Sequence, residues 1–139
     1  MTGVYSVKMH YLDASALVKL VADDPDEEPG RAVLRQYYRD HPNRRATSYC
    51  VTETLSAFKS KYLRKRISEE QYIRYGKDFI GNVIGANLRI DEVSILLPVV
   101  RTEAERLIKA HAIDFLDAFQ IVTCCAGDIS TWWGNHGPF

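Results

Sequence analysis

The fold is decided by residues 7–21, which read Val-Lys-Met-His-Tyr-Leu-Asp-Ala-Ser-Ala-Leu-Val-Lys-Leu-Val. This pattern predicts a short buried strand at about Lys8–Leu12 that ends at Asp13, and then an apolar helix at about Ser15–Ala22. Ser15 is the expected N-cap of that helix. A carboxylate at the carboxyl end of a strand, directly before a helix, lies where open α/β sheets bind ligands. Asp13 is therefore either a turn or capping residue or part of a ligand site.

The length and composition are typical of one globular domain. The chain has 139 residues, of which 46% are hydrophobic, enough to bury a core without disulfides. Its three cysteines have no zinc or redox spacing, and an odd number fits a reducing compartment. We find no signal peptide and no apolar run long enough to span a bilayer. We therefore expect a single domain, residues 1–139, in the cytoplasm and without a membrane anchor.

The charges are unevenly distributed although the net charge is zero. Residues 1–30 hold two Lys or Arg and six Asp or Glu, whereas residues 31–66 hold ten Lys or Arg and two Asp or Glu. A basic block in an otherwise acidic chain indicates a surface for a polyanion, although a solvated basic face explains it equally well. The candidate contacts to such a polyanion are first Arg44, Arg45, Lys59, Arg64 and Lys65, and then Arg31, Arg35, Lys61 and Arg66.

Strands and helices alternate along the rest of the chain. The expected helices are about Arg31–Asp40, Thr52–Arg66 with Thr52 as its cap, Ser68–Ile84 with a capping box of Ser68 and Gln71, Val99–His111, and Ile113–Val122. The expected strands are Ala46–Val51 and Leu88–Val93. The acidic segment Asp23–Gly30 is expected to be a solvated loop. The alternation predicts an α/β fold with a mainly parallel sheet.

Three carboxylates fall at equivalent points of this pattern. Asp13 follows the first strand, Glu53 lies in the first turn of the helix after the second strand, and Asp117 lies near the start of the last helix. If the strands are parallel neighbours, the three side chains meet at one edge of the sheet. Oxygen ligands alone suit Mg²⁺ or Mn²⁺, which orient a phosphodiester and activate water. Each acid also has a structural explanation, Glu53 with the helix dipole and Asp117 in a capping box with Asp114.

The same residues carry a resemblance to the PIN-domain family, the nuclease fold of VapC-type toxin ribonucleases. Tyr11–Leu20 resembles the opening aspartate motif of the family, and Thr52–Leu55 is similar to the segment with its second acid. Ile113–Phe119 is similar to the third motif, where the Asp before Ala is the metal ligand. The resemblance implies a three-layer α/β/α sandwich and an endoribonuclease, a hydrolase that depends on Mg²⁺ or Mn²⁺. It also implies a homodimer and a cognate antitoxin protein.

The resemblance assigns roles to individual residues. Asp13, Glu53 and Asp117 are its catalytic acids and hold one metal ion, directly or through water. Ser15 and Asp114 are outer partners, and Ser15 is expected to orient the Asp13 carboxylate or a metal-bound water. Hydroxide generated at the metal attacks the phosphodiester and leaves a 5′-phosphate and a 3′-hydroxyl.

The chain departs from the family pattern after the last helix. The family has a further core strand there, which supplies a fourth acid, and a final helix. Here the chain stops at His136–Phe139, and Asp128 is the only acid left. Either the sequence is cut short here or the protein lacks that edge of the sheet. In both cases we expect a sheet that is truncated at its C-terminal end, with an edge able to pair with another chain, and a weakened or inactive nuclease.

Two other functions stay open on the sequence. The first is a non-catalytic RNA- or protein-binding domain that keeps the fold without the fourth acid. The second is a phosphotransferase of the haloacid dehalogenase type, in which a nucleophilic Asp also follows the first strand. That class has a second Asp two residues later and a lysine late in the chain, whereas this chain has Ser15 and ends its lysines at Lys109.

Overall fold

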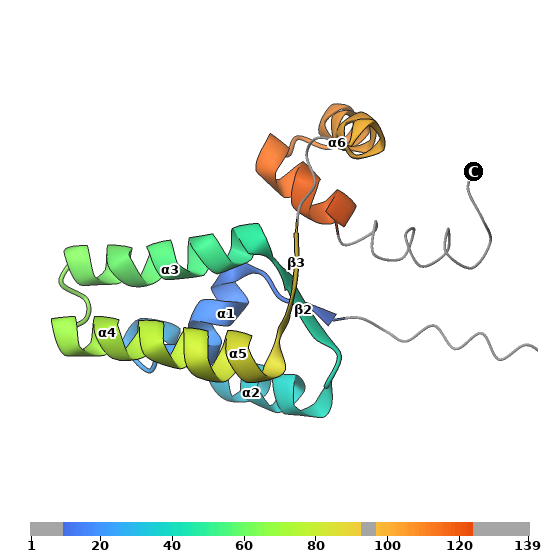
Figure 1. The fold of residues 1–139 in the computed structure, drawn as a ribbon. Helices are drawn as coiled ribbons and strands as arrows, with labels where there is room; N and C mark the ends of the chain where they lie inside the picture. Colours follow the sequence, from blue (N-terminus) through green and yellow to red (C-terminus); the bar gives the residue numbers. More distant parts are fainter. Residues whose placement is uncertain (1–9, 93–96, 124–139) are drawn as a thin grey trace, which may run out of the picture. The chain divides into compact units, whose positions relative to one another are not determined.

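A computed structural model describes residues 10–92 and 97–123 of the chain (Figure 1). The chain divides into two compact units, residues 1–90 and residues 91–139, and each unit is described by itself. The prediction of a single domain stays a prediction. Three parts of the prediction lie outside the described residues: Lys8 and Met9 of the first strand, Val93 of the third strand, and the C-terminal segment with Asp128.

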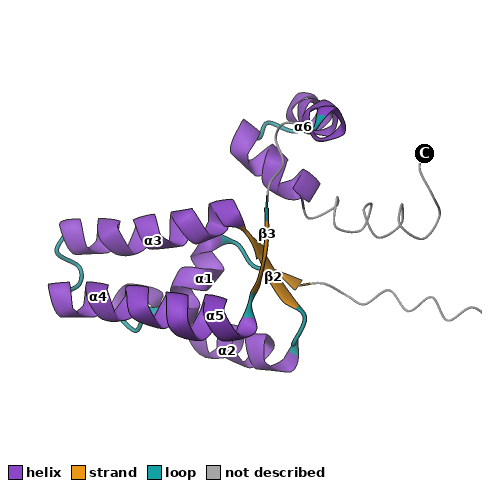
Figure 2. Ribbon diagram, in the orientation of Figure 1, coloured by secondary structure: helices purple, strands orange, loops and turns teal. Residues whose placement is uncertain are grey.

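The first unit is mostly helical and contains a small sheet (Figure 2). Its helices are α1 (Ala14–Val21), α2 (Arg31–Asp40), α3 (Ser48–Leu63), α4 (Glu69–Asp78) and α5 (Gly85–Asn87), with a 3-10 turn η1 (Pro25–Glu27) and a π-helical stretch η2 (Phe79–Ile84). The described strands are β1 (His10–Tyr11), β2 (Arg44–Thr47) and β3 (Arg89–Asp91), and they lie in that order. β1 and β2 run parallel. The predicted mixed α/β class is confirmed.

The core of the first unit forms where α3 packs against both α1 and α4 (Figure 1). Phe58 of α3 is fully buried, with its ring centroid 5.5 Å from that of Tyr75 and 6.0 Å from that of Phe79. Leu17 of α1 is also fully buried in this core. Burial of each such side chain contributes about 1.5–3 kcal/mol, so these contacts stabilise the packing of α1 and α4 against α3.

The boundary between the second strand and the third helix differs from the prediction. β2 ends at Thr47, and Thr47 caps α3 by accepting a hydrogen bond from the Cys50 amide on Oγ1 at 3.3 Å. The prediction of a strand over Ala46–Val51 with Thr52 as the cap was wrong, because the alternation of β-formers continues past the true cap. Thr52 instead donates its hydroxyl to the Ser48 carbonyl at 3.3 Å. α3 therefore begins one turn earlier than expected.

Other boundaries agree with the sequence. α2 has the predicted bounds. The predicted capping box at the start of α4 is confirmed: Ser68 Oγ accepts from the Gln71 amide at 3.1 Å, and Gln71 Oε1 accepts from the Ser68 amide at 2.9 Å. The helix continues through η2, where Gly81 and Gly85 lower helix propensity.

The second unit contains two described helices, α6 (Pro98–Ala110) and a helix at residues 115–123. They bury a small apolar cluster in which Val100 and Ala104 of α6 meet Ala118 and Val122. Asp114 caps the second of these helices, since its Oδ1 accepts from the Asp117 amide at 2.7 Å. Among the described helices of the chain, none combines the length and the apolar character that a bilayer crossing requires.

Candidate functional site

Asp13 lies at the carboxyl end of the first strand and caps α1. Its Oδ1 accepts hydrogen bonds from the Ala16 amide and from Ser15 Oγ, both at 2.9 Å. The expectation that Ser15 is the N-cap was wrong: Asp13 has the extended backbone of a cap, and Ser15 lies in the first turn. The expected hydrogen bond from Ser15 to the Asp13 carboxylate is confirmed. Within the described residues Oδ2 accepts no hydrogen bond, and the side chain is exposed.

The carboxyl ends of β1 and β2 lie side by side. Tyr11 is opposite Arg45, and the Leu12 amide donates to the Arg45 carbonyl at 2.8 Å. Continuing this register by two residues places Asp13 beside Thr47, where β2 ends and α3 begins. The two strand–helix turns therefore share one edge of the sheet, as predicted for the first two acids.

Glu53 lies in the second turn of α3 rather than the first, because that helix begins at Ser48. It is three residues after the buried Cys50, on the same side of the helix. Burial raises the pKa of the Cys50 thiol, hydrogen bonds with Thr47 lower it, and the charges of Glu53 and Asp13 raise it further. Both carboxylates therefore lie close enough to act on one thiol, although they come from different elements.

Asp117 belongs to the second unit. It is exposed in the first turn of the helix at residues 115–123, where Asp114 is the N-cap and the Asp117 amide is its partner. The cap that the sequence predicts for Asp114 is confirmed. Because each unit is described by itself, the convergence of Asp117 with Asp13 and Glu53 stays a prediction.

The donor set is compatible with Mg²⁺ or Mn²⁺. Within residues 10–92 and 97–123, no group of three or more His, Cys, Asp or Glu side chains is placed to hold a metal ion. Magnesium, however, is commonly held by one or two carboxylates and keeps several waters. Asp13 is exposed and Glu53 is half-buried, so both carboxylates keep access to solvent and are chemically suited to such an ion.

The basic candidates fall into two groups. Arg44 and Arg45 are half-buried on β2, and the Arg44 guanidinium lies 3.9 Å from the centroid of the Tyr38 ring. Lys59, in the C-terminal part of α3, and Arg64 and Lys65, directly after that helix, are exposed. The second group is therefore the one that faces solvent.

A hollow of about 460 Å³ lies between α1, η1 and α3. Its lining residues are Ser15, Val18, Asp26, Glu27, Ala57, Ser60, Lys61, Arg64 and Arg66, and we name it the α1–α3 hollow. Ser15, which donates to Asp13, forms one end of it. The sequence analysis missed this feature. Its only signal is the spacing of the α3 residues Ala57, Ser60, Lys61 and Arg64, which recur on one helix face.

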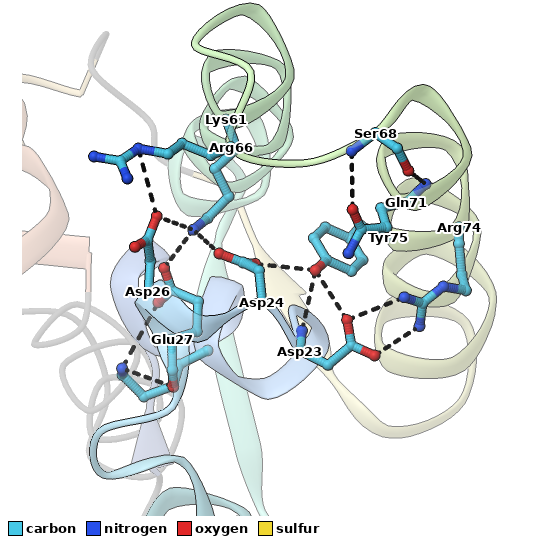
Figure 3. Close-up of polar contacts among 11 residues, drawn as sticks. Asp23, Asp24, Asp26, Glu27, Lys61, Arg66, Ser68, Gln71, Arg74 and Tyr75 are labelled. Carbon is cyan, nitrogen blue, oxygen red and sulfur yellow. Dashed lines mark hydrogen bonds and ion pairs between the residues drawn. The ribbon is translucent and has the colours of Figure 1, made fainter.

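The acidic segment after α1 is not a solvated loop, so that expectation was wrong. Asp24 is 2% exposed, and its Oδ2 lies 2.7 Å from Lys61 Nζ (Figure 3). Lys61 Nζ also lies 2.7 Å from Glu27 Oε2. Burial lowers the pKa of Lys61, but the hydrogen bonds to Asp24 and Glu27 outweigh burial and raise it overall. Lys61 is therefore an internal partner of η1 rather than an open cation.

The same segment is tied to α4 through Tyr75 and Arg74 (Figure 3). The buried Tyr75 hydroxyl lies 3.0 Å from both Asp23 Oδ1 and Asp24 Oδ1 and accepts from the Asp23 amide at 3.2 Å. Arg74 donates two hydrogen bonds of 3.0 Å to the Asp23 carboxylate, which lowers the pKa of Asp23 to about 2. Burial, helped by both aspartates, raises the pKa of Tyr75. These contacts set the position of η1 at the rim of the α1–α3 hollow.

No protein-family model, curated protein or solved structure matches this sequence.

Proposed function

We propose that this protein is a metal-dependent endoribonuclease of the PIN type, in which Asp13, Glu53 and Asp117 hold one Mg²⁺ or Mn²⁺. The observation that supports the proposal is the parallel pairing of β1 and β2, which puts the turn with Asp13 beside the start of α3, the helix that carries Glu53. Carboxylates gathered at such an edge form the ordinary ligand position of an open α/β sheet.

Each residue has a defined task in this proposal. Ser15 and the Ala16 amide hold Oδ1 of Asp13, which leaves Oδ2 directed to a cation or its water. Glu53 supplies a second carboxylate from a rigid helix, and Asp117 the third. Cys50 stays a neutral thiol because its pKa is raised. The metal, when bound, polarises the phosphate and activates water.

The resemblance also supports finer features of the proposal. These are a three-layer α/β/α arrangement, a homodimer and a protein antitoxin, whereas a cytoplasmic location is proposed from the odd number of cysteines. They rest on the motifs around Asp13, Glu53 and Asp117 and on the alternation of strands and helices.

One observation favours a second function, a non-catalytic RNA- or protein-binding domain. Asp13 and Asp114 each cap a helix, so capping alone accounts for both carboxylates. A cap is worth about 1 kcal/mol, which is enough to retain an acid at either position without catalysis.

Cleavage of a mixed RNA pool tests the proposal. The wild-type chain is expected to cleave RNA with Mg²⁺ or Mn²⁺ and not with EDTA. Asp13→Asn, Glu53→Gln and Asp117→Asn should each reduce the rate at least about a hundredfold, since each removes a charged metal ligand. Asn caps a helix as well as Asp, so Asp13→Asn keeps the fold.

Glu105→Gln is the matched control, because Glu105 is an exposed acid on α6 to which the proposal gives no role. Equal activity of the wild type and Asp13→Asn would contradict the nuclease proposal. RNA binding without metal-dependent cleavage would favour the non-catalytic domain.

A further inference from the structure

The α1–α3 hollow connects the acidic edge of the sheet with the basic end of α3. Ser15, the partner of Asp13, lines one end, and Arg64 and Arg66 line the other. A second hollow of about 590 Å³ lies at the turn between α3 and α4, lined by Tyr62, Leu63, Lys65, Arg66, Ile67, Ser68 and Gln71. We name it the α3–α4 hollow. Arg66 lines both hollows, so they are neighbours at its side chain, and we refer to the two hollows together as the groove.

The cations along this groove differ in how fully they are already paired. Lys61 is only 13% exposed and lies 2.7 Å from both Asp24 and Glu27, so its charge is neutralised inside the protein. Arg64 is exposed, and its guanidinium has no ion pair with any of the described residues. Arg66 is 65% exposed, and its pair with Asp26 is long, at 3.9 Å, and open to solvent. Such a pair is weak, so Arg66 can exchange Asp26 for another anion.

The turn that carries these arginines is well defined. Lys65 has a left-handed backbone with φ of 59°, the Arg66 amide donates to the Lys61 carbonyl at 2.9 Å, and the Lys65 amide donates to the Tyr62 carbonyl at 3.0 Å. This is a Schellman cap. It satisfies carbonyls that would otherwise repel an anion at the end of α3. Ile67 is buried directly after it, so Arg66 projects from a fixed backbone.

We propose that a single strand of RNA follows this groove, and that Arg64 and Arg66 bind one of its phosphates on the side of the groove away from Asp13. Arg66 leaves Asp26 when the phosphate binds. Arginine suits this task because its planar guanidinium binds phosphate oxygens in pairs. Asp26 loses this partner when Arg66 moves, and its carboxylate then repels the bound phosphate, which makes Asp26 a negative determinant of binding. This inference rests on the proposed function, because it takes RNA as the ligand of the same site.

Binding of a short fluorescein-labelled single-stranded RNA, followed by anisotropy in EDTA, tests the groove without cleavage. Arg64→Gln and Arg66→Gln should each weaken binding several-fold. The double variant, which leaves their shared phosphate without a partner, should reduce the slope of log K against log salt by about 0.7. The double variant should bind at least about tenfold more weakly. Lys77→Gln is the matched control, because Lys77 is an exposed cation on α4 that lines neither hollow. It should leave affinity and slope unchanged.

A variant that is expected to tighten RNA binding distinguishes a true contribution of the groove from a loss of binding caused by misfolding. Asp26→Asn frees Arg66 and removes a negative charge from the groove, so it should tighten RNA binding about two- to threefold, within the range by which one exposed ion pair changes a free energy. Glu105→Gln, which removes an exposed acid on α6, should not tighten binding. Thermal unfolding by circular dichroism checks that all variants are folded.

Several results would overturn the inference. These are a wild type that does not bind RNA in EDTA, a double variant that binds like Lys77→Gln, and displacement of the labelled RNA by a polyglutamate peptide as effective as that by unlabelled RNA of equal charge. Failure of the catalytic proposal looks different. In that case the arginine variants lose RNA binding as expected, while Asp13→Asn cleaves RNA as fast as the wild type.

Discussion

Replacement of Lys61 by Met tests whether the acidic segment after α1 is held in place by a buried ion pair. The ammonium group of Lys61 lies 2.7 Å from a carboxylate oxygen of Asp24 and 2.7 Å from one of Glu27. Met has a similar length and keeps the apolar contacts of the stem, so the substitution removes mainly the charge. In the Lys61→Met variant, Asp24, which is 2% exposed, keeps only the Tyr75 hydroxyl as a side-chain partner among the described residues.

The size of the effect follows from the distances. Two unit charges 2.7 Å apart attract by about 6 kcal/mol at an effective dielectric constant of 20. Desolvation of the ammonium group offsets a part of this attraction. Glu27 can turn towards water, but Asp24 cannot. We therefore expect Lys61→Met to lower the free energy of unfolding by about 3–4 kcal/mol, within the range for removing one partner of a buried pair.

Urea unfolding followed by circular dichroism at neutral pH measures this change. Lys59→Met is the matched control, since Lys59 is an exposed lysine on the same helix, and it should change the free energy by less than about 0.5 kcal/mol. The double variant Lys61→Met/Asp24→Asn should be more stable than Lys61→Met alone, because no buried charge is left unpaired. A loss below about 1 kcal/mol in Lys61→Met, or an equal loss in Lys59→Met, would refute this reasoning.

Three further predictions concern stability. Arg74 holds the pKa of Asp23 at about 2 against an ordinary 3.8, so the stabilisation from this pair is present above pH 3.8 and is lost as the pH falls through 2. Arg74→Met should therefore reduce the change of the urea midpoint between these two pH values, and a change equal to that of the wild type would contradict the pairing. Lys65→Gly relieves a left-handed backbone and should raise the free energy of unfolding by about 1 kcal/mol, whereas a lower free energy of unfolding would contradict the strain. Ser68→Ala should cost about 1 kcal/mol and Ser68→Asp much less; equal losses would argue against the capping box.

The features that the sequence predicts well are those decided by nearby residues. The capping box of Ser68 and Gln71 and the bounds of α2 depend on side chains within one or two helical turns. The Asp13 position follows from a short apolar run that ends in a carboxylate before a helical pattern. The cap of Asp114 on the last described helix is local in the same way.

The features that the sequence predicts poorly are decided by contacts between distant segments. Thr47 and Thr52 are equally good caps by residue type, and pairing of β2 with β1 decides where the strand ends. The acidic segment looks solvated because its partners, Lys61 and Tyr75, lie 37 and 51 residues after Asp24. Long-range pairs of this kind leave no periodic signal.

Binding of Mn²⁺ to the full chain, measured by titration calorimetry, tests the central claim most directly, because it needs no substrate. We expect one ion per chain in the wild type. Asp13→Asn, Glu53→Gln and Asp117→Asn should each weaken its binding at least about tenfold, because Mn²⁺ prefers charged oxygen ligands. Glu105→Gln should leave the affinity unchanged. Wild-type affinity in Asp13→Asn and Glu53→Gln would contradict a shared metal site at the edge of the sheet.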